Sequence, residues 1–556
     1  MIEFIIANLA PIMFVSLVVF LLSGFPVAFS LAANGLFFGF VGIELGLLKP
    51  ELLQALPNRI FGIMANDTLL AIPFFTFMGL ILERSGMAED LLDTIGQLFG
   101  PLRGGVAYAV IFVGALLAAT TGVVAASVIS MGLISLPVML RYGYDKKLAA
   151  GVIAASGTLA QIIPPSLVLI VMADQLGRSV GDMYQAAFIP GLILTAMYAG
   201  YVALISILRP HWVPALPPEA RNLREPNGDS GARSLLALVL LAVGGAFSFA
   251  KLYGAQHPAM AADEVGIFAA SVAILGAFAL AVANRKFKLG LLSRMAEKVV
   301  FVLIPPLALI FLVLGTIFIG IATPTEGGGM GALGALVLAV MNGRLSVDLL
   351  KQAMHSTTRL SCFVVFILIG STVFSLIFRG VNGDLWVEHL LSSLPGGNVG
   401  FLIVVNLLFF VLAFFLDFFE LAFILVPLVG PVADKLGIDL IWFGVLLGVN
   451  MQTSFMHPPF GFALFYLRSV APKEVKTSDI YWGAIPFVVI QIVMVALIIS
   501  FPNIVSVSSK VDMKEQIELN LTMPSDPSAE PDAEIKDGEA PVLNFSSDSG
   551  SDSEKK

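Results

Sequence analysis

The sequence predicts an all-α polytopic membrane protein made of two inverted repeats, each with a re-entrant helical hairpin and a discontinuous helix. This prediction depends on the composition, on the lengths of the apolar runs and on proline motifs that recur at nearly constant spacing. Of the 556 residues, 58% are hydrophobic and 13% are charged, whereas soluble domains carry about 25% charged residues. The mean hydropathy is +0.93. These values exclude a soluble domain.

Apolar runs long enough to cross a bilayer occur along most of the chain. A transmembrane helix needs about 20 predominantly apolar residues. The runs that meet this requirement are 4–23, 25–43, 66–84, 147–174, 185–208, 234–252, 265–284, 299–320, 324–342, 359–379, 440–467 and 481–503. We therefore expect a multi-pass protein.

Two further apolar runs, 106–140 and 400–432, do not fit this series. Each is too long for one span and too short for two spans with a loop. Each also has polar groups near its middle, Thr120 in the first run and Asp417 in the second. We therefore predict two re-entrant hairpins, in which the chain turns back inside the membrane.

Basic residues predict the orientation of the chain. The loops at 141–147, 209–233, 285–298 and 344–359 are rich in Lys and Arg, and alternation of the spans puts all four on one side. Basic short loops are typical of the cytoplasmic side. We expect a bacterial inner-membrane protein with both termini in the periplasm.

Several function classes lack their sequence signatures. The only cysteine, Cys362, can form neither an intramolecular disulfide nor a cysteine metal cluster. No phosphate-binding G-x-x-x-x-G-K-[ST] motif supplies an ATP motor, no nucleophile–base pair indicates an enzyme, and no basic stripe indicates nucleic-acid binding. The tail, 507–556, is acidic and rich in Ser and Pro, which predicts disorder.

Proline anchors occur twice along the chain in the same order. They are Pro26 and Pro324, Pro137 and Pro427, and the pairs Pro164–Pro165 and Pro458–Pro459, separated by 298, 290 and 294 residues. The spacing indicates a first repeat at 1–208 and a second at 299–506, with an insertion at 209–298 that adds two spans. An odd number of crossings between equivalent points inverts the copies, as in many secondary transporters.

In each repeat the span after the hairpin contains a Pro-Pro pair at mid-depth. Proline removes an amide donor and disfavours helix in the residue before it, so the spans 147–174 and 440–467 should break there. We expect the breaks to release carbonyls near Ser156 and Asn450. Helix N-termini attract anions, and carbonyl and hydroxyl oxygens suit sodium. The alternative is that each Pro-Pro pair only kinks a buried helix.

At these motifs the chain resembles a known family. The segments GIATPTEGGGMGALGALVL, AASGTLAQIIPPS and the stretch from Asp417 to Pro427 are similar to the large membrane subunit (DctM-like) of tripartite ATP-independent periplasmic (TRAP) transporters. The resemblance covers residues 4–208 and 299–503. It implies an elevator-type fold like that of the ion-transporter superfamily, and sodium-driven import of small organic acids. It also implies a small four-helix membrane subunit and a periplasmic substrate-binding protein as partners.

The resemblance further implies sodium ligands at the hairpin tips and at the broken spans. The matching positions are Thr120, Thr121, Gly122, Ser127, Ser156, Gly157, Thr158, Asp417, Asn450, Gln452 and Thr453. Many relatives have a Ser-Gly-Ser-Ser run at the first hairpin, where this chain has Ala119-Thr120-Thr121-Gly122, so the ligating carbonyls there stay open. No organic cofactor is implied.

Glu420 and His457 are candidates for a substrate site. Glu420 lies one helical turn after Asp417, so the two acids would share a cation or a proton, or one would be neutral. His457 precedes Pro458 and is either a substrate contact or a packed, hydrogen-bonded histidine. We expect sodium-coupled import of a small carboxylate, such as a C4-dicarboxylate or keto acid. The alternative is a proton-coupled transporter or exporter of organic anions, with Glu420 and His457 as the relay.

Overall fold

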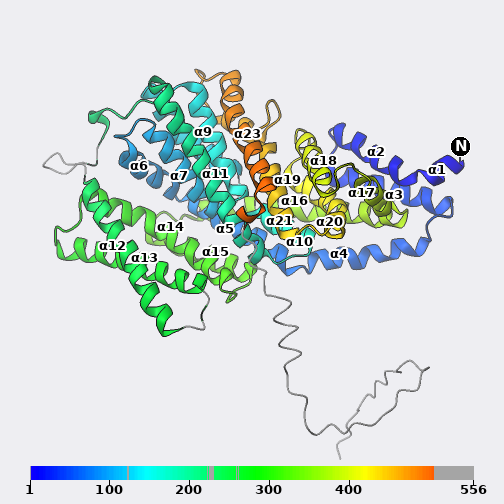
Figure 1. Cartoon of the computed structure of the whole chain (residues 1–556), viewed down its shortest axis with the longest axis horizontal. Coiled ribbons are helices and arrows are strands. Elements are labelled where there is room, and N and C mark those ends of the chain that lie inside the picture. Colours follow the sequence, from blue (N-terminus) through cyan, green and yellow to red (C-terminus); the bar gives the residue numbers. More distant parts are fainter. Residues whose placement is uncertain are drawn as a thin grey trace, which may run out of the picture. The chain divides into compact units, whose positions relative to one another are not determined.

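The computed structural model describes residues 2–121, 124–221, 223, 231–257, 260 and 262–505, and all regular elements in these ranges are helical. Figure 1 shows their order along the chain. The tail that was predicted to be disordered, 507–556, lies outside these ranges. The first half contains α1 (Ile2–Ala7), α2 (Leu9–Leu22), α3 (Val27–Glu44), η1 (Pro50–Ala55), α4 (Leu56–Met64), α5 (Asp67–Arg84), α6 (Met87–Phe99), α7 (Gly105–Thr121), α8 (Val124–Arg141), α9 (Lys146–Thr158), η2 (Leu159–Gln161), α10 (Leu167–Leu176) and α11 (Val180–Leu208).

The rest of the described chain forms the insertion and the second half. The insertion contains η3 (Pro210–Trp212), η4 (Pro218–Ala220), α12 (Ala232–Gln256) and α13 (Ala262–Phe287). The second half contains α14 (Arg294–Phe318), α15 (Pro324–Met341), α16 (Val347–Gly380), α17 (Gly383–Ser392), α18 (Gly397–Leu412), α19 (Phe418–Ile424), α20 (Val426–Lys435), α21 (Leu440–Gln452), η5 (Thr453–Phe455), α22 (Phe462–Val470), α23 (Thr477–Ser500) and η6 (Pro502–Ile504).

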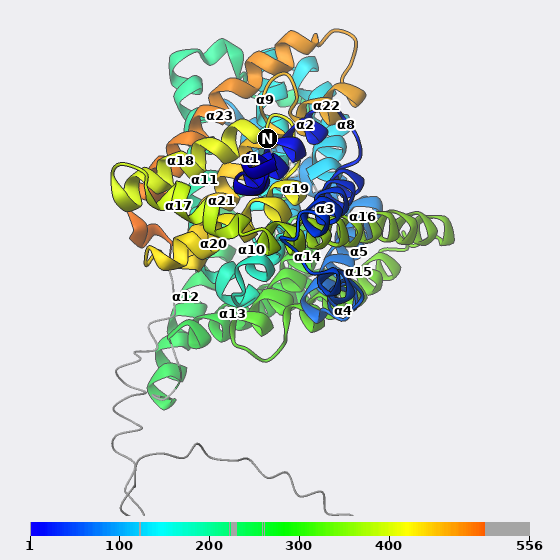
Figure 2. The ribbon, with the colours of Figure 1, turned by 90° about the vertical axis from the view of Figure 1, so that its right-hand side faces the viewer.

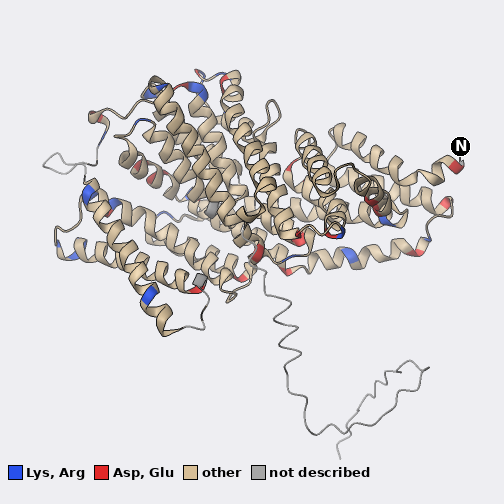
Figure 3. Ribbon diagram, in the orientation of Figure 1, with Lys and Arg blue, Asp and Glu red and all other residues tan. Residues whose placement is uncertain are grey.

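The lengths and composition of these helices agree with a multi-pass membrane protein. Among the described residues, eight helices are each long and apolar enough to cross a bilayer, and they are α3, α8, α11, α12, α13, α14, α16 and α23. Two bent helix pairs, η1–α4 with α5 and α17 with α18, bring the number to ten if each pair counts as one span. Charged side chains lie chiefly near helix ends and in loops (Figure 3).

Elements of the two halves correspond at a nearly constant offset. Helices α9 and α21 have 13 residues each and begin 294 residues apart, at Lys146 and Leu440, and η2 and η5 are also 294 apart. Helix α8 corresponds to α19 and α20 together, again at 294. This offset aligns Pro137 with Pro431 inside α20. The pairing of Pro137 with Pro427 from the sequence is therefore wrong, because the short break between α19 and α20 had not been foreseen.

Packing between the halves is reciprocal. Helix α3 packs along α16, and its counterpart α15 packs along α5. Helix α9 packs along α23 while α21 packs against α11, and α8 packs against α22 while α19 and α20 pack against α10. Figure 2 shows α3 beside α16. Each contact recurs with its members exchanged between the halves, which is the pattern of a two-fold pseudo-symmetric molecule.

Both predicted hairpins return to their starting points. In the first, the amide of Val106 at the start of α7 donates to the hydroxyl of Tyr144 just after α8, at 3.2 Å. In the second, Nδ2 of Asn398 at the start of α18 donates to the carbonyl of Leu436 just after α20, at 3.1 Å. Residues 292 apart thus close the two hairpins at equivalent places. Their depth in a membrane stays a prediction.

The halves differ at one long helix. Helices α5 and α16 end 296 residues apart, at Arg84 and Gly380, so Asn66 corresponds to Cys362. The first copy bends by 45° between α4 and α5, whereas α16 is continuous. Asn66 caps α5 by accepting from the amide of Thr68 at 3.0 Å, and its Nδ2 donates to Oδ1 of Asp174 on α10 at 2.7 Å. These bonds stabilise the bend in the first half.

We expect Gly483→Ala to destabilise the protein. A Cβ at Gly483 in α23 would lie 2.1 Å from the carbonyl oxygen of Lys147 in α9, so the two helices would have to separate. Overpacking of this kind costs about 1–3 kcal/mol. The measurement is the Tm of the purified protein. Gly244→Ala in α12 is the matched control, because its Cβ would meet nothing within 4 Å; equal Tm values for the two variants would contradict the close helix crossing.

Candidate functional site

Both spans with a Pro-Pro pair are broken helices. Each consists of an α-helix, a 3₁₀ turn and a further helix after the prolines, α9–η2–α10 and α21–η5–α22. The carbonyls that were expected to be released are occupied. The carbonyl of Ser156 accepts from the amide of Leu159, and that of Asn450 accepts from the hydroxyl of Thr453 at 2.7 Å. The prediction of free carbonyls there is wrong, because the 3₁₀ turns close i→i+3 bonds.

Equivalent residues of the two broken helices meet. Nε2 of Gln452 donates to Oγ1 of Thr158 at 3.1 Å, and these two residues are 294 positions apart, the offset between the halves. Both side chains are fully buried. A contact between equivalent residues lies at the pseudo-two-fold axis, so the two breaks share one site.

Two residues that the sequence analysis did not single out join this contact. Nε2 of Gln491 on α23 donates to the hydroxyl of Tyr198 on α11 at 2.9 Å and lies 3.5 Å from Oγ1 of Thr158. We call Thr158, Gln452, Gln491 and Tyr198 the axis cluster. A single glutamine in the apolar run 481–503 was the only signal in the sequence, and its partner depends on how α23 is rotated.

The second hairpin is joined to its broken helix through paired asparagines. Nδ2 of Asn450 on α21 donates to the carbonyl of Asn406 on α18 at 2.8 Å and to its Oδ1 at 3.1 Å. Asn406 was also missed, and its signal was one amide within the apolar run 400–432. The bonds fix the hairpin arm against the break, next to the predicted sodium ligands.

Asp417 and Glu420 form a capping box at the turn of the second hairpin. Oδ1 of Asp417 accepts from the amide of Glu420, and Oε2 of Glu420 accepts from the amide of Asp417, both at 3.0 Å. Both side chains are half-buried. The reciprocal bonds orient the two acids toward the start of α19. Asp417 therefore lies where the sequence places the hairpin turn and acts as its cap.

His457 is enclosed by aromatic rings. Its ring stacks on Phe414 with the centroids 4.2 Å apart and meets Phe410 at 4.3 Å. It is 1% exposed, and neither ring nitrogen has a hydrogen-bond partner among the described residues. A packed, hydrogen-bonded histidine, the alternative that the sequence left open, does not describe it. An unpaired buried donor costs free energy unless a ligand or water meets it.

The first hairpin is described only in part. Gly122 and the side chains of Thr120 and Thr121 lie outside the described residues. Ser127 is buried in α8. Gly157 allows α8 to approach α9, because a Cβ there would lie 2.3 Å from Cγ2 of Val128. The hydroxyl of Ser156 is buried without a hydrogen-bond partner among the described residues.

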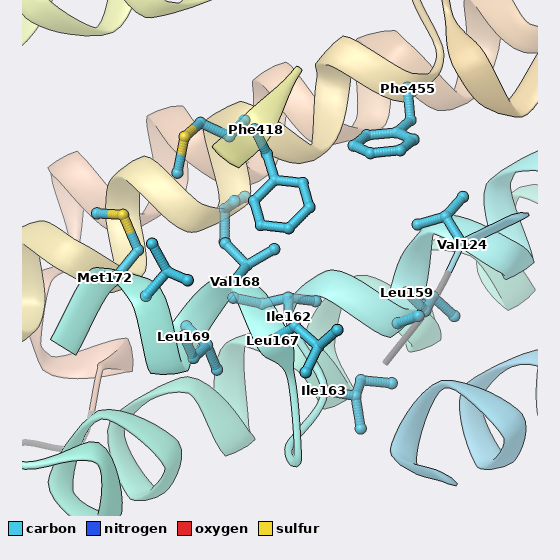
Figure 4. Packing of buried hydrophobic residues seen from close by; sticks show 14 of the residues in the cluster. Val124, Leu159, Ile162, Ile163, Leu167, Val168, Leu169, Met172, Phe418 and Phe455 are labelled. Atoms are coloured by element: carbon cyan, nitrogen blue, oxygen red, sulfur yellow. The ribbon is translucent and has the colours of Figure 1, made fainter. Parts of the chain in front are cut away.

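The two breaks differ in exposure and capping. Pro164 and Pro165 are buried, and Ser166 caps α10 by accepting from the amide of Leu169 at 3.4 Å. Pro458 is half-buried and Pro459 is exposed, and no side chain caps α22. Figure 4 shows the closed packing around the first break, with Phe418 of the second hairpin above Val168.

The described oxygen atoms suit a hard monovalent cation better than a transition metal. No group of three or more His, Cys, Asp or Glu in the described part of the chain could hold a metal ion. Buried oxygens without partners there include Ser156 Oγ, Gln452 Oε1 and Ser454 Oγ. Neutral hydroxyl and amide oxygens are ligands that sodium accepts. The residues present therefore fit sodium.

A family model described as "Tripartite ATP-independent periplasmic transporter, DctM component" matches residues 14–504. The chain belongs to this family. It is therefore a membrane transport component and not an enzyme, and the resemblance seen in its motifs is confirmed.

Relatives of this DctM-family chain have different names. It is 26% identical over 459 residues to the C4-dicarboxylate TRAP transporter large permease protein DctM of Pseudomonas aeruginosa, with 82% of this chain and 90% of that protein covered. It is 25% identical over 494 residues to the ectoine TRAP transporter large permease protein TeaC of Halomonas elongata, with 89% and 97% covered. Among solved structures, the YdaH transporter of Alcanivorax borkumensis aligns with a TM-score of 0.46 and 14% identity over 82% of this chain and 90% of that one.

We expect Thr158→Val to destabilise the DctM-family chain by removing the hydroxyl that accepts from Gln452. The amide of Gln452 would keep no partner in a fully buried place, and an unsatisfied buried group costs about 1–3 kcal/mol. The Tm of the purified protein measures this loss. Thr158→Ser keeps the hydroxyl and should retain most of the stability. A Val variant as stable as the wild type would show that the bond contributes nothing.

Proposed function

We propose that this chain is the large membrane subunit of a sodium-coupled transporter that imports small organic acids. The contact between Thr158 and Gln452 carries the proposal, because it joins two broken helices from two repeats at one buried site. Paired discontinuous helices at a repeat interface are typical of substrate and ion sites in secondary transporters. The named ligand set around the breaks would hold sodium, which supplies positive charge next to the solute.

A carboxylate substrate is favoured by the second break. Helix α22 has nine residues, begins after the exposed Pro459 and Phe460, and has no side-chain cap. Uncapped helix N-termini attract anions. Gly461 is required there, since a Cβ would lie 2.6 Å from the carbonyl oxygen of Phe455. His457, whose ring nitrogens have no partner among the described residues, lies four residues before it and could donate to the same anion.

We further propose that the hairpins and broken helices move together as an elevator. The two halves have the same order of elements but differ in conformation, with the first break buried and the second exposed, and with α5 bent from α4 where α16 is straight. Inverted repeats that exchange two such conformations would open the site alternately to each side. The bond between Asn66 and Asp174 would hold one of the two states.

The partners proposed for this subunit are those of a tripartite system. A periplasmic binding protein would deliver the solute, and a small four-helix membrane subunit would accompany this chain in the inner membrane. The relatives named for C4-dicarboxylate and ectoine support a small, polar, carboxylate-bearing solute. We place both termini in the periplasm, from the basic loops.

Sodium dependence tests the proposed coupling. The complete complex in proteoliposomes, supplied with radiolabelled C4-dicarboxylate and the binding protein, should take up solute under an inward sodium gradient. A proton gradient alone should give none. Uptake driven by protons without sodium would overturn the sodium coupling and favour the alternative relay, for which Glu420 and His457 are the titratable groups.

A pair of substitutions at Asp417 separates its charge from its capping role. Asparagine caps helices as well as aspartate, whereas alanine loses about 0.5–2 kcal/mol. Asp417→Asn should therefore keep the wild-type Tm but lose most sodium-driven uptake, and Asp417→Ala should lose both. The measurements are Tm and initial uptake rate. Full uptake by the Asn variant would mean that the carboxylate acts as a cap alone.

A further inference from the structure

Gln491 has a fixed amide orientation in the axis cluster. The hydroxyl of Thr158 donates to the carbonyl of Ala155 at 2.8 Å, so it can only accept from its other neighbours. The amide groups of Gln452 and Gln491 must therefore direct their nitrogens toward it. The bond from Gln491 to Tyr198 uses the same nitrogen. The two amide oxygens consequently point away from these hydroxyls.

Both of these amide oxygens lack donors. Oε1 of Gln452 and Oε1 of Gln491 are buried without a hydrogen-bond partner among the described residues, and both side chains are 0% exposed. Leaving two buried acceptors unsatisfied is costly, and native proteins normally avoid it. The two oxygens belong to amides that share one acceptor, Thr158, so they lie in the same small region.

We propose that Gln491 is a ligand of the coupling cation, and that its amide oxygen acts together with that of Gln452. The inference rests on the proposed sodium coupling and extends it to α23, which contributes none of the residues implied by the family resemblance. A dehydrated site that offers neutral amide oxygens suits a monovalent cation. It places a ligand from the last helix next to both broken helices, so that cation binding connects α9, α21 and α23.

A water molecule is the rival occupant. One water could donate to both amide oxygens and satisfy them, since buried waters commonly make about three hydrogen bonds. Under that arrangement Gln491 stabilises the fold but does not change the affinity for sodium. The two occupants therefore differ in one measurable quantity, the sodium concentration that produces a half-maximal effect.

The test uses the purified complex and sodium itself as the probe, so no solute needs to be known. Tm is measured against sodium chloride concentration, with choline chloride keeping the ionic strength constant. Gln491→Met keeps the length of the side chain and removes its oxygen. We expect the half-maximal sodium concentration to rise about tenfold or more, the size of change typical when the surroundings of a metal site are altered.

Two further variants complete the test. Thr94→Val is the matched control, because the Thr94 hydroxyl on α6 is also buried without a partner among the described residues, but it lies on a helix that packs against α7 and α14. It should keep the wild-type sodium response. Gln491→Glu retains an oxygen and adds a negative charge, so it should lower the half-maximal sodium concentration. It decides the question if the Met variant does not fold.

The outcomes separate this inference from the proposed function. If the wild type is stabilised by sodium and both Gln491 variants keep its half-maximal concentration, Gln491 is not a ligand, while sodium coupling stands. If sodium and choline affect the wild type equally, the sodium site and this inference both fail. A shift in the Gln491 variants that is absent in the Thr94 variant supports the assignment.

Discussion

The hydrogen bond between Gln452 and Thr158 is the contact on which the arrangement of the broken helices depends. It joins equivalent residues, so it can form only where the two repeats meet at their common axis. The surroundings are fully buried, and each polar atom there needs a partner. Small residues make the approach possible, because a Cβ at Gly151 would lie 2.1 Å from the carbonyl oxygen of Gly483. Close packing of α9 and α23 thus keeps the polar contact in place.

Around this shared contact the two halves adopt different conformations. The first break is buried and capped by Ser166, and the second is open with an uncapped helix. The bend at Asn66 has no counterpart in α16. Since the order of elements is the same, neither conformation is forced by the local plan of a repeat. Tertiary contacts such as that of Asn66 with Asp174 decide which half takes which form.

The sequence was a good guide where the signal is local. Pro-Pro pairs predicted both breaks, and Asp417 predicted the turn of the second hairpin, because proline and capping residues act on their own segment. Gln491 and Asn406 were missed because a lone amide in a long apolar run has a meaning only once helix rotation gives it a partner. The carbonyls at Ser156 and Asn450 were misjudged because a 3₁₀ turn re-forms bonds that proline had removed.

Exchange between two states is the central claim, and a cross-link tests it most directly. Asn66→Cys and Asp174→Cys, combined with Cys362→Ser, place the only two thiols where Asn66 and Asp174 are bonded. A short, cleavable thiol cross-linker should join them and hold the complex in one state. We predict that sodium-driven uptake then falls to background and returns when the linker is cleaved. A cross-linked complex that transports at the rate of the untreated one would contradict the account.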